Sequence, residues 1–237
     1  MKNIGLISPN LNEDSLADVY KILPEGIRIE GRALNVRQYL DSEFESAERA
    51  FTLVVRDLAR QPLDYLMITG ELFLSYKGPG SDRIILESIK GITSTPASTV
   101  LTAVVHACHV LGLRRVVMAS PFPEEQNIRL ARFLEHDQIE VTEHRGLGHD
   151  NSRTIWTLPP DTGYELASSM IRRCPDVDGI YMPCNKWRIT SVIDRIEKEF
   201  GKPVVTNTQA WIWEALRGMG QRKSIAGFGH LLSDLMA

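Results

Sequence analysis

The sequence DGIYMPCNKWR, residues 178–188, joins a short apolar run to a cysteine and a turn. Gly179–Met182 is typical of a buried strand, and apolar side chains recur at the helical period from Ile189 to Phe200. Cys184 is therefore expected at the carboxyl end of a strand, just before a helix. That edge of an α/β sheet binds ligands, and free amides at a helix start stabilise a thiolate or a carboxylate. The pattern predicts a reactive thiol at Cys184; the alternative is a small apolar core residue.

Short apolar strands alternate with amphipathic helices along the whole chain. The strands are expected at residues 3–7, 26–33, 65–69, 115–119, 140–143, 179–182 and 203–205. The helices are expected at residues 14–23, 45–60, 124–136, 163–173 and 189–200. This alternation is typical of parallel sheets covered by helices.

Four features of the first half recur in the second half. The pairs lie 112 to 114 residues apart and are Ser8-Pro9 with Ser120-Pro121, Asp64 with Asp178, Gly70 with Cys184, and Thr93–Ala97 with Thr206–Ala210. A repeat at one separation indicates two similar α/β units. We predict two pseudo-symmetric Rossmann-like lobes with parallel sheets, the N-lobe from residues 1–94 plus 209–237 and the C-lobe from residues 95–208. The active site is expected in the cleft between them.

Composition limits the kind of partner. The 237 residues are 43% hydrophobic and 24% charged, which is ordinary for a globular protein with buried cores. The net charge of −3 gives no electrostatic reason to expect nucleic acid or an anionic membrane. No apolar run is long enough to span a bilayer, and Met1–Pro9 leads directly into a strand rather than resembling a signal peptide. A cytoplasmic protein with a small-molecule partner is predicted.

The three cysteines are Cys108, Cys174 and Cys184. Their odd number and their spacing argue against a disulfide framework and against a structural zinc site. We expect no bound metal and at least one free thiol.

Five segments together resemble one known family. They are Gly70–Gly78, the Cys184 segment, Pro203–Val205, Ala210–Trp213 and Gly227–Gly229. On these segments the chain resembles the aspartate/glutamate racemase superfamily, in particular the branch of arylmalonate decarboxylases and maleate cis-trans isomerases. Gly70–Gly78 is similar to a decarboxylase segment that begins Gly-Thr-Ser and ends Tyr-Arg-Gly. The resemblance implies a cofactor-independent enzyme that acts on a small carboxylic acid through a carbanion or enediolate.

The resemblance also implies roles for particular residues. Two-base members of the superfamily carry one cysteine on each lobe, whereas this chain has Gly70 at the N-lobe position. That is the decarboxylase pattern, in which the single C-lobe cysteine, here Cys184, protonates the enediolate after carbon dioxide leaves. The residues implied to surround the substrate are Pro9, Asn12, Gly70, Leu72, Phe122, Asn151, Asn185 and Lys186, with backbone amides of Glu71, Leu72, Asn185 and Lys186 as oxyanion donors.

Asn12 and Asn151 come from stretches that resemble the isomerases. Ser8–Asn12 is similar to their N-terminal turn, and Asp150-Asn151 to an Asp-Asn pair. The resemblance makes both asparagines donors to a substrate carboxylate. The alternative is ordinary turn chemistry, in which asparagine is common.

Three positions depart from the decarboxylase pattern. Glu71 and Leu72 stand where the decarboxylases have Thr and Ser, and Phe122 stands where they have Tyr. A carboxylate beside an anionic substrate is repulsive unless it is protonated or paired. Glu71 therefore turns away, holds a substrate amine, or acts as a second acid/base opposite Cys184; alternatively it is a solvated residue at a helix start. Lys186 either attracts a carboxylate or lies on a solvated helix face.

Two functions of different classes remain open. The first is an enzyme, preferably a decarboxylase with Cys184 as proton donor, with an isomerase or racemase that uses Cys184 and Glu71 as the alternative. The second is a relative that binds carboxylates without chemistry. Trp187, Trp211 and Trp213 supply apolar surface for the lobe interface or for a subunit contact, and we expect a homodimer or larger homo-oligomer.

Overall fold

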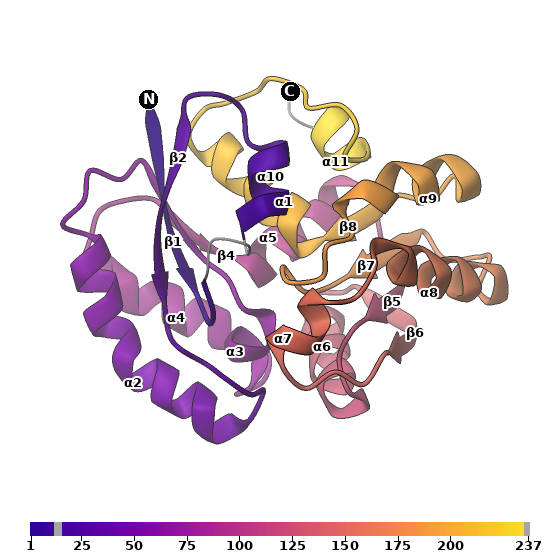
Figure 1. The fold of residues 1–237 in the computed structure, drawn as a ribbon, viewed down its shortest axis with the longest axis horizontal. Helices are drawn as coiled ribbons and strands as arrows, with labels where there is room; N and C mark the ends of the chain where they lie inside the picture. Colours follow the sequence, from indigo (N-terminus) through magenta and orange to yellow (C-terminus); the bar gives the residue numbers. More distant parts are fainter. Residues whose placement is uncertain (12–15, 235–237) are drawn as a thin grey trace.

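The computed structural model describes residues 1–11 and 16–234, and it contains two separate four-stranded sheets (Figure 1). The strand orders are β2-β1-β3-β4 and β6-β5-β7-β8, and every pairing is parallel. The second order is the first with four added to each strand number, so the same unit occurs twice. The predicted fold of two pseudo-symmetric α/β lobes is confirmed.

The N-lobe sheet consists of β1 (Lys2–Ser8), β2 (Ile27–Ala33), β3 (Tyr65–Ile68) and β4 (Ala97–Thr99). Its helices are α1 (Ala17–Ile22), α2 (Asp41–Leu58), α3 (Glu71–Ser75) and α4 (Ser81–Lys90). Because β4 pairs with β3, the first sheet continues to Thr99, beyond the predicted lobe boundary at residue 94. The other residue bounds of the lobes stay a prediction.

The C-lobe sheet consists of β5 (Arg115–Ser120), β6 (Glu140–Gly146), β7 (Gly179–Met182) and β8 (Val204–Thr206). Its helices are α6 (Glu124–His136), α7 (Ser152–Trp156), α8 (Pro160–Arg173) and α9 (Ile193–Phe200), with the short 3-10 helix η2 (Thr190–Val192) before α9. The helix expected from Ile189 therefore begins at Ile193. The residues directly after Cys184 form a turn, so the amides near the thiol are not those of a helix start.

The repeated aspartates tie the strands of each sheet together. Asp64 accepts a hydrogen bond from the Asn3 amide at 2.9 Å, which fixes the start of β3 beside β1. Asp178 accepts from the amides of Arg114 and Arg115 at 2.9 and 2.8 Å, which fixes the start of β7 beside β5. The recurrence of aspartate in the sequence thus has the same structural cause in both lobes.

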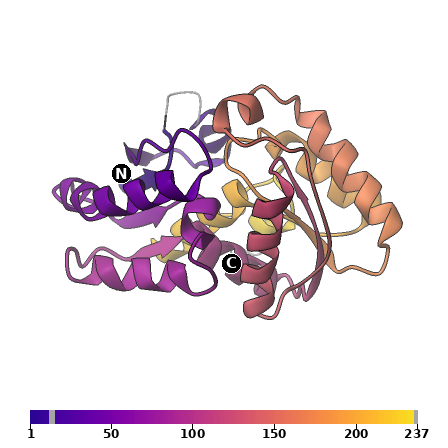
Figure 2. The same ribbon diagram turned by 90° about the horizontal axis from the view of Figure 1, so that it is seen from below.

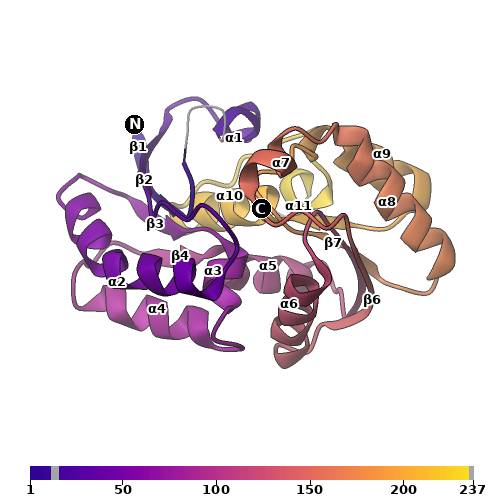
Figure 3. The same cartoon turned by 60° about the horizontal axis from the view of Figure 1, so that its bottom comes forward.

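Two helices join the lobes. They are α5 (Val100–Val110), which follows β4, and α10 (Asn207–Gly218), which follows β8. Thr99 and Thr206 cap them in the same way, each accepting a hydrogen bond from the amide three residues later. The two helices pack on each other, and each contacts strands of both sheets. Figures 2 and 3 show them in the middle of the molecule, between the purple N-lobe and the salmon to orange C-lobe.

The three tryptophans that were considered for an interface lie in the interior of the single chain. Trp187 and Trp211 are each 1% exposed and Trp213 is 3% exposed. They fill the protein core and are not available for a subunit contact, so the expected homodimer loses this support. The terminal helix α11 (His230–Ser233) packs on α10 and β8. Within residues 1–11 and 16–234, no helix combines the length and the apolar character that a membrane crossing requires.

Candidate active site

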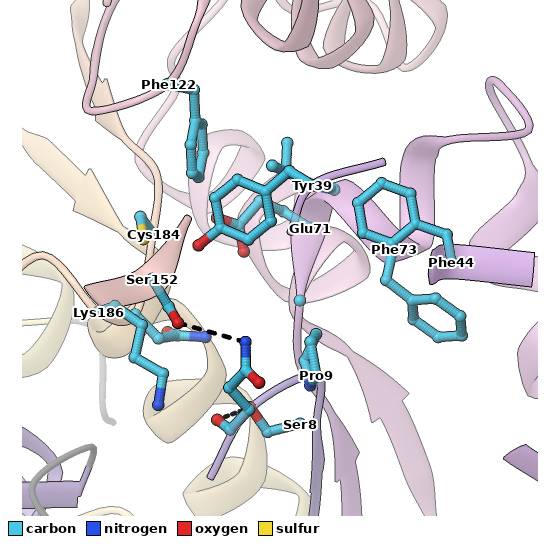
Figure 4. A pocket seen from close by; sticks show the side chains of 14 residues that line it. Ser8, Pro9, Tyr39, Phe44, Glu71, Phe73, Phe122, Ser152, Cys184 and Lys186 are labelled. Carbon is cyan, nitrogen blue, oxygen red and sulfur yellow. Dashed lines mark hydrogen bonds between the residues drawn. The ribbon is translucent and has the colours of Figure 1, made fainter. Parts of the chain in front are cut away.

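The carboxyl ends of β3 and β7 meet at one cavity between the lobes (Figure 4). β3 delivers Gly70 and Glu71 from the N-lobe, and β7 delivers Cys184 from the C-lobe. Eight of the residues predicted for the site line this cavity, namely Pro9, Gly70, Glu71, Leu72, Phe122, Cys184, Asn185 and Lys186. The sequence rule that ligands bind where parallel strands end therefore identifies the right edge of each sheet.

Gly70 and Cys184 have the same unusual backbone conformation. Their φ angles are +98° and +87°, in the left-handed region that favours glycine. For a residue with a side chain, such a conformation costs on the order of 1–3 kcal/mol and is held by the surrounding structure. The chain thus accepts strain at Cys184 in order to turn the thiol into the cavity.

Cys184 is buried, with 5% of the residue exposed. Burial and the nearby Glu71 raise its pKa above the ordinary range, although the amides of Lys186 and Trp187 hydrogen-bond the sulfur and lower the pKa in part. The expected stabilisation of the sulfur by nearby amides is therefore present, but burial has the larger effect on the pKa. A neutral thiol in this position has a proton to donate.

The Glu71 carboxyl group is also buried, with 4% exposure. Burial raises its pKa to about 7, against the opposing hydrogen bonds from its own amide, from the Asn207 side chain and from the Cys184 amide. Glu71 is therefore not the solvated helix-start residue of the alternative interpretation. A carboxyl group with this pKa exchanges its proton near neutral pH, a property shared by many general acids and bases.

Asn207, which the sequence reasoning missed, links Glu71 to a buried tyrosine. Asn207 is fully buried, and its Oδ1 accepts a hydrogen bond from the Tyr181 hydroxyl at 2.8 Å. With Oδ1 engaged in this bond, the buried amide nitrogen is left for Glu71, whose pKa it lowers in part; within the described part of the chain, this nitrogen has no hydrogen-bond partner at ordinary distance. The sequence indicated only part of this arrangement. It predicted that a helix begins after Thr206, but it did not place the first residue of that helix in the cleft.

One wall of the cavity is aromatic. Tyr39, on the loop between β2 and α2, lies edge-on to Phe122 with ring centroids 5.6 Å apart. Figure 4 shows its hydroxyl directed toward Glu71 and Cys184. Burial, followed by the proximity of the ionisable groups of Cys184 and Glu71, raises the Tyr39 pKa well above its usual range. Tyr39 thus brings a phenol hydroxyl to the cavity, where Phe122 has none.

The opposite wall is polar and includes a lysine. Asn10 Nδ2 donates to Ser152 Oγ at 3.4 Å, and Ser8 Oγ donates to the Asn10 carbonyl at 2.9 Å. Lys186 lies beside them, and burial lowers its pKa to about 8. In Figure 4, Lys186 and Ser152 lie on the side of the cavity away from Tyr39 and Phe122.

Of the two asparagines implied by the isomerase resemblance, the structure describes Asn151. Asn12 lies outside the described residues. Asn151 does not line the cavity, since its Oδ1 caps α7 by accepting from the amides of Arg153 and Thr154, both at 3.1 Å. The alternative reading of Asn151 as a capping residue fits the structure. Across residues 1–11 and 16–234, no three His, Cys, Asp or Glu side chains gather in a way that suits a metal ion.

A second thiol at Gly70 meets a steric obstacle. A Cβ atom built there lies 2.1 Å from Pro9 Cγ and 2.5 Å from Pro9 Cδ. We expect Gly70→Cys to lower the free energy of unfolding by about 1–3 kcal/mol, a typical cost of overpacking. Urea unfolding measures the change. In a double-mutant cycle, adding Pro9→Ala is expected to recover part of the loss, and equal stability of Gly70→Cys and wild type would contradict the clash.

Comparison with known proteins places a chain with this fold and site in the aspartate/glutamate racemase superfamily, in the branch of arylmalonate decarboxylases and maleate isomerases. The sequence pattern of the arylmalonate decarboxylase family matches residues 4–232, and the chain belongs to that family.

Individual relatives agree with this assignment. The arylmalonate decarboxylase of Bordetella bronchiseptica is 28% identical over 180 residues, which cover 76% of this chain and 75% of the relative. A maleate isomerase of Pseudomonas putida is 20% identical over 242 residues, covering 97% and 96%. A crystal structure of arylmalonate decarboxylase superimposes with a TM-score of 0.83 at 25% identity, covering 97% of this chain and 98% of that one. The maleate isomerase Iso of Pseudomonas putida S16 superimposes with a TM-score of 0.90 at 20% identity, covering 98% of each chain. The chain is a decarboxylase or an isomerase.

Proposed function

We propose that the chain is a decarboxylase of a small malonate-type acid, with Cys184 as the proton donor. The observation that supports this most directly is the single neutral thiol at a strained strand end, opposite a glycine on the other lobe. A decarboxylase needs one proton donor on one face of the reacting carbon. The relative from Bordetella bronchiseptica, at 28% identity, is a decarboxylase.

The proposed reaction has two steps. The carbon–carboxylate bond breaks, carbon dioxide leaves, and the bonding electron pair stays on the α-carbon as an enediolate. The Cys184 thiol then gives its proton to that carbon and becomes a thiolate. The amides of Lys186 and Trp187, which already hydrogen-bond the sulfur, stabilise the new negative charge until solvent returns the proton.

Glu71 has a role in the proposed decarboxylase and also in the isomerase that is the second candidate. As a neutral acid, it donates a hydrogen bond to an enediolate oxygen, as a threonine hydroxyl would at this position. The Asn207 side chain, held by Tyr181, orients the carboxyl group for this purpose. Tyr39 supplies a second hydroxyl from the aromatic wall.

An isomerase or racemase is the second candidate. The observation that favours it is the Glu71 pKa of about 7, on the lobe opposite Cys184. Such a carboxyl group is able to take a proton from one face of a carbon while the thiol supplies one to the other face.

A cytoplasmic location and a homodimer also stay predictions. Light scattering tests whether the protein is a homodimer.

A panel of malonates, maleate and amino diacids, followed by proton NMR in deuterium oxide, tests the proposal. A decarboxylase is expected to release carbon dioxide and to place one deuterium on the α-carbon of the product. Conversion of maleate to fumarate, or exchange of the α-proton of an intact amino diacid, would support the isomerase or racemase instead. Absence of all three reactions would contradict both and favour a binding protein without chemistry.

A further inference from the structure

Tyr39 belongs to the N-lobe in sequence, but its backbone is bonded to the C-lobe. Its amide donates a hydrogen bond to the Asp150 carbonyl at 3.1 Å. Its carbonyl accepts a hydrogen bond from Gln126 Nε2 at 3.3 Å. In Figure 1 the chain leaves β2, runs toward α6 and α7, and turns back into α2. Both backbone polar groups of this cavity residue are thus held by the opposite lobe.

An ion pair strengthens the same attachment two residues further on. The two terminal nitrogens of Arg129, on α6, donate to the two carboxylate oxygens of Asp41 at 2.5 and 3.1 Å. Two parallel bonds of this kind fix the guanidinium and the carboxylate in one geometry. Gln126 and Arg129 are three residues apart and so lie on the same face of α6. One face of this helix therefore holds the chain at residue 39 and again at residue 41.

The Tyr39 side chain continues these contacts into the cavity. Its ring lies edge-on to Phe122, which directly precedes the start of α6 at Pro123. Its hydroxyl is directed toward Glu71 and Cys184 (Figure 4). A tyrosine side chain rotates about only two bonds, so the backbone position largely determines where the hydroxyl lies. Contacts outside the cavity thus set the place of a hydroxyl inside it.

We propose that Gln126 and Arg129 are positioning residues, which hold Tyr39 so that its hydroxyl stays beside the carbon that Cys184 protonates. The inference rests on the proposed function, since it requires a reaction in which the hydroxyl stabilises developing negative charge. Gln126 and Arg129 lie outside the set of residues that lines the cavity, so both act through Tyr39. A displacement of a reacting group by about 1 Å is enough to slow a reaction strongly.

The attachment is expected to matter more for the reaction than for global stability. The Asp41 side chain is 52% exposed and that of Arg129 is 24% exposed, and ion pairs of exposed groups contribute little to the free energy of unfolding. Gln126 is buried, but its Oε1 has no hydrogen-bond partner in the described part of the chain. Replacement of Gln126 with methionine therefore removes one donor and keeps the length of the side chain. We expect variants at both α6 positions to fold.

Hydrogen exchange tests the attachment without any turnover. The Tyr39 amide is protected by its bond to Asp150, so it exchanges faster when the segment is loosened. Mass spectrometry follows the peptide that contains Tyr39 in the wild type, in Gln126→Met and in Arg129→Met. We expect exchange about fivefold faster in both variants, the factor to which one lost hydrogen bond corresponds. Arg132→Met is the matched control, since Arg132 is an exposed arginine on the same helix, and it is expected to leave the rate unchanged.

Steady-state kinetics test the consequence for the acid that the wild type converts. Tyr39→Phe is expected to lower kcat at least about tenfold, because a donor to the developing charge is lost. Arg129→Met is expected to lower kcat about threefold to tenfold and to change KM less than about twofold, because the hydroxyl acts in the transition state. In the Tyr39→Phe background, Arg129→Met is expected to lower kcat less than about twofold, since no hydroxyl is left to position.

Three results would overturn the inference. They are unchanged exchange in both α6 variants, faster exchange with an unchanged kcat, and an equal loss of kcat from Arg129→Met with and without the Tyr39 hydroxyl. The last result would mean that the ion pair only supports the fold. A decarboxylase in which Tyr39→Phe keeps full kcat retains the proposed function and loses the positioning role. A wild-type protein that converts none of the acids loses both, whereas faster exchange would still show that α6 holds Tyr39.

Discussion

Replacement of Cys184 with alanine is expected to lower kcat at least about 100-fold on whichever acid the wild-type enzyme converts, because the enediolate loses its proton donor. The fold is expected to persist, since the side chain is small and alanine meets the same backbone strain at φ +87° as cysteine does. Steady-state kinetics measure the loss, and circular dichroism checks the fold. Cys184→Ser is expected to retain little activity, because the much higher pKa of a hydroxyl makes it a poor proton donor.

Cys108→Ala is the control for this experiment. Cys108 is a fully buried free thiol on α5, outside the cavity, and burial raises its pKa to about 12. Its replacement removes a buried sulfur atom without touching the reaction, so kcat is expected to stay within about twofold of wild type. Full turnover by Cys184→Ala would refute the proposed mechanism and return Cys184 to the role of a core residue.

Replacement of Glu71 with glutamine is expected to make the protein more stable than wild type at alkaline pH. The folded-state pKa of Glu71 is raised to about 7, so the folded protein binds this proton more tightly than the unfolded chain does. As the pH rises from about 4.5 to about 7, the unfolded chain releases the proton first, and the wild type loses stability. A shift of about 2.5 pKa units corresponds to a loss of about 3 kcal/mol, and the loss is constant above pH 7.

Urea unfolding of both proteins at pH 5 and pH 8.5 measures this difference. From pH 5 to pH 8.5, the unfolding free energy of Glu71→Gln minus that of the wild type is expected to increase. Glu48→Gln is the control, because Glu48 is a partly exposed carboxylate whose pKa is lowered by Lys77 and Tyr76, so its replacement is not expected to give an alkaline gain. A gap that does not change with pH would show that Glu71 is ionised in the folded protein throughout. If Glu71 is the second base, the same variant also stops α-proton exchange in deuterium oxide.

The fold was predictable from the sequence because its causes are local and repeated. Asp64 and Asp178 recur since each ties the start of one strand to its neighbour. The strand ends that carry Gly70 and Cys184 follow from the rule for parallel sheets. Thr206 was part of a recognised repeat, and the structure explains it as one of two matching helix caps.

The remaining features of the site depend on how the lobes pack. Tyr39 reaches the cavity from a connecting loop, and no periodic pattern marks such a residue. The protonation states of Glu71 and Cys184 depend on burial between two lobes, which spacing along the chain does not reveal. The implied role of Asn151 followed from resemblance, whereas local capping chemistry accounts for the position that the side chain takes.

The central pairing of α5 and α10 has a consequence for how the chain unfolds. Each of these helices contacts strands of both sheets, so loss of one lobe removes part of the apolar cover of the other. The halves share one interior, and neither keeps both faces of its sheet covered alone. Unfolding is therefore expected to be cooperative across both lobes. The repeat that is visible in the sequence is a repeat of architecture, whereas the unit that folds is the whole chain.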